Sequence, residues 1–179
     1  MDAAPRSAAA AADGALPLVI GLGNEHRGDD AAGLWVARRL APRLAGRARV
    51  VELGGDGARL IELWDGADLA IVVDAVTSDR PPGTVHRIEV GAEPLPSSLG
   101  ATSTHAVSLA QAVALAQALG RRPRRLLIFG VEGRRFAPGA SPSPEVTAAI
   151  DPLAAAVERE LASAGPEASD AAAGRPGRA

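Results

Sequence analysis

The chain has 179 residues, of which 47% are hydrophobic but only 2% are aromatic. A chain of this length can form one domain with a sizeable core, which here must be built from Val, Leu, Ile and Ala. Its 19 basic and 21 acidic residues give a net charge of −2, which excludes a general attraction to nucleic acid or to an anionic membrane. We therefore expect partners that are proteins or small ligands.

The sequence contains no cysteine, so any metal must be bound by histidine, carboxylates and water. Residues 1–15 lack the apolar core of a signal peptide, and no apolar run long enough to span a membrane follows. The expected location is therefore the cytoplasm. Residues 1–15 and 165–179 are rich in Ala, Gly and Pro and are expected to be disordered tails around a single α/β domain at 16–164.

The domain opens with its most informative stretch, residues 16–33. An apolar run, Leu18 to Ile20, is followed by Gly21-Leu-Gly-Asn24, a charged loop, and a helical pattern that begins at Asp29 and Asp30. This order predicts a strand, a glycine turn, an acidic loop and a helix over 29–41. A strand at 47–53 and a short helix at 57–64 are expected next.

The rest of the domain continues to alternate strands and helices. Residues 68–76 form a β-branched apolar run, typical of a strand covered on both faces. Residues 84–90 alternate with period two, which predicts an antiparallel strand near an edge with one face in solvent. The remaining expected elements are a loop at 91–103, a helix to 119, a strand at 124–132 and a helix at 143–164. Together they predict a three-layer α/β fold: a mainly parallel, twisted sheet of about five strands with helices on both faces.

Three side chains with metal-binding chemistry follow elements of this fold. Asp30 comes after the first strand, Asp74 ends the third, and His105 stands at the entrance of a helix. Carboxylates that follow parallel strands lie at the same edge of the sheet, where ligands bind in open α/β folds. Two carboxylates and one imidazole would hold a divalent transition metal, such as zinc or nickel, with coordination positions left open.

Each of these residues also has a structural explanation. Asp29 or Asp30 could cap the following helix or complement its dipole, and a turn hydrogen bond or an arginine could satisfy Asp74. His105 could be a polar residue satisfied at a helix start. His86 lies on the alternating strand and is expected to be a surface residue.

Other motifs of enzymes and nucleotide-binding proteins are incomplete. Gly21-Leu-Gly23 begins a dinucleotide-binding fingerprint, but His26 occupies the position that needs the third glycine. The chain has no lysine for a phosphate-binding loop, and no G-x-S-x-G nucleophile elbow.

Two blocks near the start resemble a known protein family. Gly21-Leu-Gly-Asn24 and Gly28-Asp-Asp-Ala-Ala-Gly33 are similar to the opening motif of the hydrogenase maturation endopeptidases, which process the large subunit of nickel-iron hydrogenases. Three later blocks occur in the order of the family, and the resemblance covers about 16–163. These blocks are Glu52-Leu-Gly-Gly55, Val73-Asp-Ala-Val76 and Ser103-Thr-His105.

The resemblance implies a site and a substrate. The metal-contacting and catalytic side chains of the family fall on Asp30, Asp74 and His105, and the activity would be that of an aspartic-type endopeptidase that activates another enzyme. The substrate would be the nickel-loaded precursor of the large subunit, cut near its C-terminus. Nickel would come with the substrate, and zinc or cadmium could replace it. The metal could polarise the scissile carbonyl or activate water, and the protein is expected to be a monomer.

Two alternatives belong to other functional classes. A non-catalytic, metal-sensing maturation chaperone would carry the same three ligands. A peptidyl-tRNA hydrolase-like esterase also begins with a strand and a Gly-Leu-Gly-Asn-like turn, but its Asn-Pro-Gly and Thr-Arg-His-Asn runs are absent. Glu25-His-Arg27 makes the first loop more charged than in relatives; His26 is expected to face solvent, and the roles of Glu25 and Asp29 stay open.

Overall fold

A computed structural model of the chain describes residues 16–78, 80–91 and 109–164. Within these residues, a five-stranded sheet has the strand order β2-β1-β3-β5-β4. In chain order, the elements are β1 (Leu18–Leu22), a 3-10 turn η1 (Gly28–Ala31), α1 (Ala32–Leu40), β2 (Arg49–Leu53), α2 (Gly57–Trp64), β3 (Leu69–Val76), β4 (Val85–Glu89), α3 (Leu109–Ala118), β5 (Arg125–Glu132) and α4 (Pro144–Ser163).

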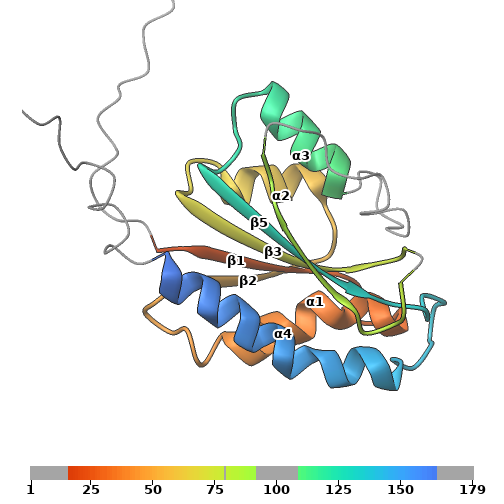
Figure 1. Cartoon of the computed structure of the whole chain (residues 1–179). Coiled ribbons are helices and arrows are strands. Elements are labelled where there is room, and N and C mark those ends of the chain that lie inside the picture. Colours follow the sequence, from red (N-terminus) through yellow and green to blue (C-terminus); the bar gives the residue numbers. More distant parts are fainter. Residues whose placement is uncertain (1–15, 79, 92–108, 165–179) are drawn as a thin grey trace, which may run out of the picture.

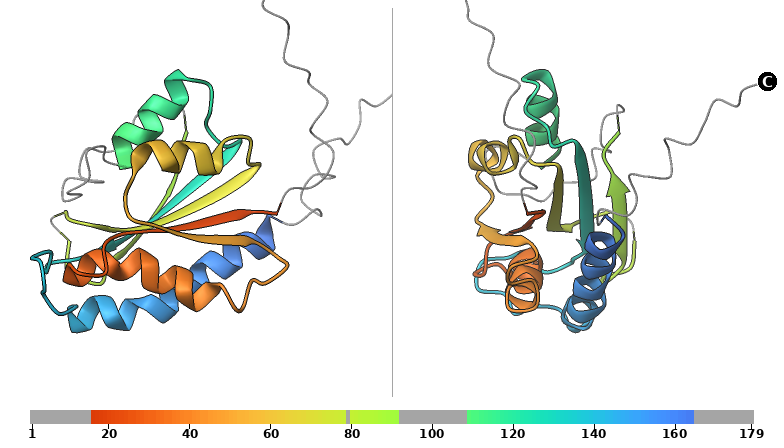
Figure 2. Two further views of the ribbon diagram at one scale, coloured as in Figure 1. Left: turned by 180° about the vertical axis from the view of Figure 1, so that it is seen from behind. Right: turned by 90° about the vertical axis from the view of Figure 1, so that its left-hand side faces the viewer.

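The sheet lies between two pairs of helices, as Figures 1 and 2 show: α1 and α4 cover one face, and α2 and α3 cover the other. β2, β1, β3 and β5 are parallel, while β4 pairs with β5 in the antiparallel direction at one edge. The prediction of a three-layer, mainly parallel sheet with an antiparallel strand near an edge is therefore confirmed.

Each face of the sheet has its own apolar core. Val19, Ile71 and Phe129 pack under α1 and α4, whereas Ile20 and Val72 pack under α2 and α3. Successive residues of a strand point to opposite faces, so a continuous apolar strand serves both cores at once. β3 is buried along its whole length for this reason, while β4 alternates between exposed and half-buried residues, as expected of an edge strand.

Two glycines allow α1 to lie close to the sheet. A Cβ atom added at Gly33 would lie 2.2 Å from the carbonyl oxygen of Leu22 and 2.3 Å from that of Val73. A Cβ atom at Gly21 would lie 2.1 Å from the carbonyl oxygen of Gly33. No side chain fits between these backbones, so the glycines fix the start of α1 against β1 and β3.

Most predicted elements agree with the structure to within one or two residues, with one exception among the described residues. The helix predicted over 29–41 begins as the 3-10 turn η1 and becomes α-helical at Ala32. The helix predicted to start near residue 103 is described from Leu109 onward. His105 and both predicted tails, 1–15 and 165–179, lie outside the described residues. None of the described helices combines the length and apolarity needed to cross a membrane.

Candidate active site

Two buried carboxylates meet where the parallel strands end, which we call the carboxyl edge. Asp30 belongs to η1, directly after β1, and Asp74 lies near the end of the neighbouring strand β3. Their exposed fractions are only 4% and 7%. Burial raises the pKa of Asp74 to about 7, with a further contribution from the negative charge of Asp30. The structure therefore brings together two of the three predicted ligands, close enough for their charges to repel.

Asp74 points toward the face covered by α2 and α3. Ala70 and Val72, four and two residues earlier in β3, both pack into the core on that face, and side chains alternate along a strand. The carboxylate accepts a 2.9 Å hydrogen bond from the N–H of Ala75. In the described part of the chain no arginine forms an ion pair with Asp74, so of the two structural explanations only the local hydrogen bond is present, and it offsets burial in part.

Asp29 has a different role from its neighbour. Its carboxylate is fully buried and accepts hydrogen bonds from the backbone N–H groups of Ser143 at 2.6 Å, Arg134 at 2.8 Å and Arg135 at 2.9 Å. Burial alone would raise the pKa of Asp29, but these hydrogen bonds outweigh burial and lower it. Asp29 thus fastens the loop between β5 and α4 to the end of β1.

Neither aspartate caps the helix with its side chain, although both lie in the first turn of η1, where a negative charge complements the helix dipole. Neither η1 nor α1 has a side-chain hydrogen bond at its N-terminal cap. The carboxylate oxygens of Asp29 accept hydrogen bonds from a loop more than a hundred positions later in the sequence. Asp30 is the carboxylate whose charge acts on Asp74. The structure therefore favours Asp30 over Asp29 as the metal-binding candidate.

The charged loop after β1 is held by its own interactions. Glu25 forms an ion pair with Arg38 at 3.1 Å, and the side chain of His26 is 84% exposed. The solvent-facing position expected for His26 is confirmed. Arg27 is the cation of this loop that reaches the site, since its Nε atom lies 3.8 Å from Oδ2 of Asp30.

Glu132, at the end of β5, is a fourth buried acid of the carboxyl edge, and sequence reasoning missed it. Only 1% of it is exposed, and its Oε1 atom accepts hydrogen bonds from the N–H and the hydroxyl group of Ser78. In the register of β3 and β5, Asp74 pairs with Gly130, and Val76 pairs with Glu132 two residues further on. Residues two positions apart in a strand point to the same face, so Glu132 lies on the same face of the sheet as Asp74. The pattern that identified Asp74, an acidic residue ending an apolar strand, applies to Glu132 too and could have found it.

His86, which was expected at the surface, lies on β4 beside the buried Glu132. It pairs with Gly130, its side chain is only 27% exposed, and its Nε2 atom lies 3.8 Å from Oε2 of Glu132. His86 is therefore half-buried rather than fully at the surface, and it lies beside the carboxylate of Glu132. Within the described ranges, no three acidic or histidine side chains are arranged to hold one metal ion.

Comparisons with known proteins identify the family. The family model HycI, described as hydrogenase maturation protease, matches residues 35–160. The chain belongs to this family. It is 31% identical over 140 residues to the hydrogenase expression/formation protein HupD of Thiocapsa roseopersicina and 30% identical over 160 residues to HupD of Rhodobacter capsulatus. The matches cover 75% and 87% of this chain, but 62% of the first relative and 75% of the second.

Solved structures of hydrogenase maturation proteases have the same fold. The hydrogenase maturating endopeptidase HybD from Escherichia coli is similar with a TM-score of 0.68 at 24% identity, over 84% of this chain and 94% of that one. The [NiFe] hydrogenase maturation protease HybD from Thermococcus kodakarensis gives a TM-score of 0.63 at 27% identity, over 82% and 99%. The resemblance carried by the opening glycine and aspartate motif is therefore confirmed.

Proposed function

We propose that this hydrogenase maturation protease removes the C-terminal extension from the precursor large subunit of a nickel-iron hydrogenase after nickel has been inserted. Family membership supports the class of reaction. The observation that carries the proposal is the pair of buried, mutually repelling carboxylates, Asp30 and Asp74, at the edge where open α/β folds bind ligands.

These carboxylates suit a metal ion. Two buried negative charges close together are costly unless a positive charge lies between them, and the hard oxygen donors of Asp30 and Asp74 fit a divalent cation. We propose nickel carried by the substrate as the natural occupant, with zinc or cadmium as replacements. A metal ion held there supplies a Lewis acid beside the scissile bond.

His105 is the proposed third ligand. It precedes Leu109 by four residues, and Leu109 packs into the same core as Val72, on the face toward which Asp74 points. The proposal therefore rests on the described start of α3, which lies on the side of the sheet toward which Asp74 points. In this proposal the three side chains recognise the nickel ion of the precursor and position the peptide bond that is cut.

Cleavage of a purified precursor tests the proposal. The large-subunit precursor, prepared with and without nickel, is incubated with the protease, and its mass is measured. We expect the nickel-loaded precursor alone to become shorter, and the Asp74→Asn and His105→Ala variants to leave it intact.

Matched controls come from exposed residues of the same types. Asp151 lies on α4 and pairs with Arg39 with 61% of its side chain exposed, and His26 faces solvent, so the Asp151→Asn and His26→Ala variants should cleave normally. Cleavage by Asp74→Asn and His105→Ala at the wild-type rate would contradict the proposed site. A non-catalytic chaperone would bind the nickel-loaded precursor without changing its mass.

A further inference from the structure

Exposed arginines lie in two loops at the carboxyl edge of the sheet. Arg80 lies in the connection between β3 and β4, and Arg134 and Arg135 lie in the loop between β5 and α4. All three are exposed, and we call them the arginine rim. Arg27, by contrast, is half-buried beside Asp30, so its charge is directed inward.

The backbone of the rim is fixed by the buried aspartate described above. Arg134 and Arg135 both donate their N–H groups to the carboxylate of Asp29, and the carbonyl oxygen of Arg135 accepts the N–H of Asp29 at 2.9 Å. At Gly28, which has a φ of +57°, an added Cβ atom would lie 2.5 Å from that same oxygen. A rigid backbone that presents mobile cationic ends limits the entropy lost on binding.

Arg80 is brought to the same region by the turn that follows it. The N–H of Gly83 donates to the carbonyl oxygen of Glu132 at 2.8 Å, and a Cβ atom at Gly83 would lie 2.8 Å from the carbonyl oxygen of Glu145. The Glu145 side chain in turn pairs with Arg134 at 3.0 Å. The turn after Arg80 is therefore packed against the first turn of α4, beside the loop that carries the other two arginines.

The charges of the rim are only partly balanced. Glu145 neutralises Arg134, and Glu25, an exposed acid of the loop after β1, is already paired with Arg38. Among residues 16–78, 80–91 and 109–164, Arg80 and Arg135 form no ion pair. Guanidinium groups bind carboxylates through paired N–H donors, so the rim suits a ligand that brings several carboxylates.

We propose that the arginine rim binds acidic side chains in the peptide segment to be removed, and thereby selects precursors whose C-terminal extension is acidic. This inference rests on the proposed function. The arginines are distributed over two loops, which fits carboxylates spaced along a peptide better than the single carboxylate of a chain end. Both loops follow parallel strands, β3 and β5, so a peptide bound by them would lie at the same sheet edge as Asp30 and Asp74.

Binding of labelled peptides tests the rim without any need for cleavage. Three synthetic peptides of the extension are compared by fluorescence anisotropy: one with its Asp and Glu residues, one with Asn and Gln in their place, and the acidic peptide with an amidated C-terminus. We expect the acidic peptide to bind about tenfold more tightly than the peptide with Asn and Gln, a difference that two exposed ion pairs can provide. Amidation of the C-terminus should change the affinity less than twofold.

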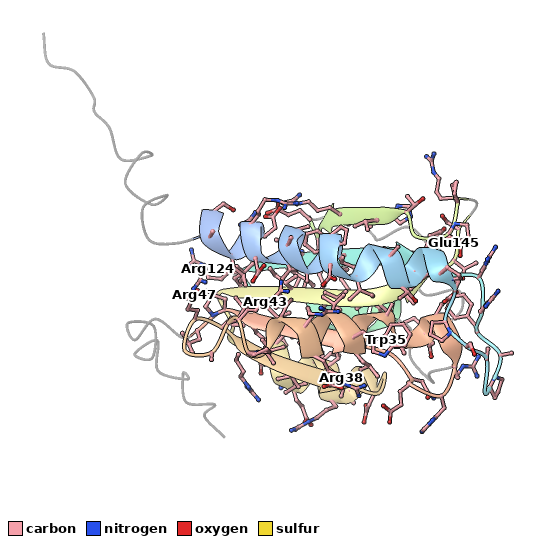
Figure 3. The ribbon with its side chains drawn as sticks, turned by 90° about the horizontal axis from the view of Figure 1, so that it is seen from below. Trp35, Arg38, Arg43, Arg47, Arg124 and Glu145 are labelled. Atoms are coloured by element: carbon pink, nitrogen blue, oxygen red, sulfur yellow. The ribbon has the colours of Figure 1, made fainter. Side chains whose placement is uncertain are left out.

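The decisive variant is the double substitution Arg80→Glu and Arg135→Glu, which should abolish the preference for the acidic peptide. Its matched control is Arg47→Glu with Arg124→Glu. Figure 3 shows Arg47 and Arg124 at the opposite end of the molecule from Glu145, so the same change in net charge there should preserve the preference. High salt should weaken the preference of the wild type.

Three results would overturn the inference. The first is equal affinity of the wild type for the acidic peptide and for the peptide with Asn and Gln. The second is a loss of preference in the Arg47→Glu, Arg124→Glu control as large as in the decisive variant. The third is a loss of binding when only the C-terminus of the acidic peptide is amidated. The proposed function fails by a different result, namely no shortening of the nickel-loaded precursor by the wild-type protein. Peptide binding therefore tests the arginine rim, and precursor cleavage tests the proposed function.

Discussion

Replacement of Asp29 by asparagine should destabilise the fold, although Asp29 lies next to a proposed catalytic residue. Its carboxylate accepts three backbone hydrogen bonds from the loop between β5 and α4. Asparagine keeps one acceptor oxygen, but its amide group turns a donor toward N–H groups that are themselves donors. At least one buried N–H group is then left without a partner.

The size of the effect follows from the number and type of these bonds. A hydrogen bond to a charged group contributes about 1.5–3 kcal/mol. The loss of one such bond, with weakening of the other two, should lower the free energy of unfolding by about 2–4 kcal/mol. For a domain of this size, that corresponds to a decrease in Tm of about 10 °C.

The effect should also depend on pH in a defined direction. The fold lowers the pKa of Asp29, so its charged form stabilises the folded state at any pH above the unfolded value of about 4. This contribution is lost as pH falls through the lower folded pKa. The difference between wild type and Asp29→Asn should therefore be complete at pH 7 and narrow below pH 4.

Urea unfolding, followed by the fluorescence of the buried Trp64, measures this difference. The control is Asp30→Asn, a neighbouring buried position where removal of the charge relieves repulsion with Asp74. The substitution also ends the ion pair between Asp30 and Arg27, and because these two effects oppose each other, we expect Asp30→Asn to lose less stability than Asp29→Asn. An Asp29→Asn protein with wild-type stability, or an equal loss in both variants, would refute the structural role assigned to Asp29.

Three further predictions concern the charge, the packing and the metal. The fold raises the pKa of Asp74 to about 7, above the unfolded value of about 4, so the free energy of unfolding decreases as pH rises from about 4 to 7. The urea midpoint of wild type should therefore fall over that range relative to that of Asp74→Asn. Gly33→Ala forces a Cβ atom to within 2.3 Å of two carbonyl oxygens and should lower the free energy of unfolding by more than about 3 kcal/mol. The control is Gly54→Ala, where the added atom has open space; its free energy of unfolding, measured in urea, should change little. Cadmium at pH 7.5 should raise the Tm of wild type, and this rise should disappear in Asp74→Asn; an equal rise in both proteins would exclude binding at the two carboxylates.

The fold was predictable because local patterns determined most of it. The continuous apolar run of β3 could be buried only between two helical layers, and the alternation over residues 85–89 identified an edge strand. The close contact between Gly33 and the backbones of β1 and β3 was not predictable, because the distance between a helix and a sheet is not encoded in periodicity.

The site was predictable only in part. Parallel topology requires residues that follow β1 and β3 to share an edge, which is why Asp30 and Asp74 could be placed together. The sequence could not separate Asp29 from Asp30, because the partners of Asp29 lie in a loop that approaches only in three dimensions. For the same reason, the proximity of His86 to Glu132 was not predictable, because it depends on the register of β4 with β5. The assignment of His105 stays a prediction.

The most direct measurement is the mass of the nickel-loaded large-subunit precursor after incubation with wild-type protein and with Asp74→Asn. Wild type should remove the C-terminal extension and leave the nickel-free precursor intact, while Asp74→Asn should cleave neither form. A precursor that keeps its full mass with wild type, or that is shortened equally by Asp74→Asn, would contradict the claim that paired carboxylates at the carboxyl edge recognise nickel and support cleavage.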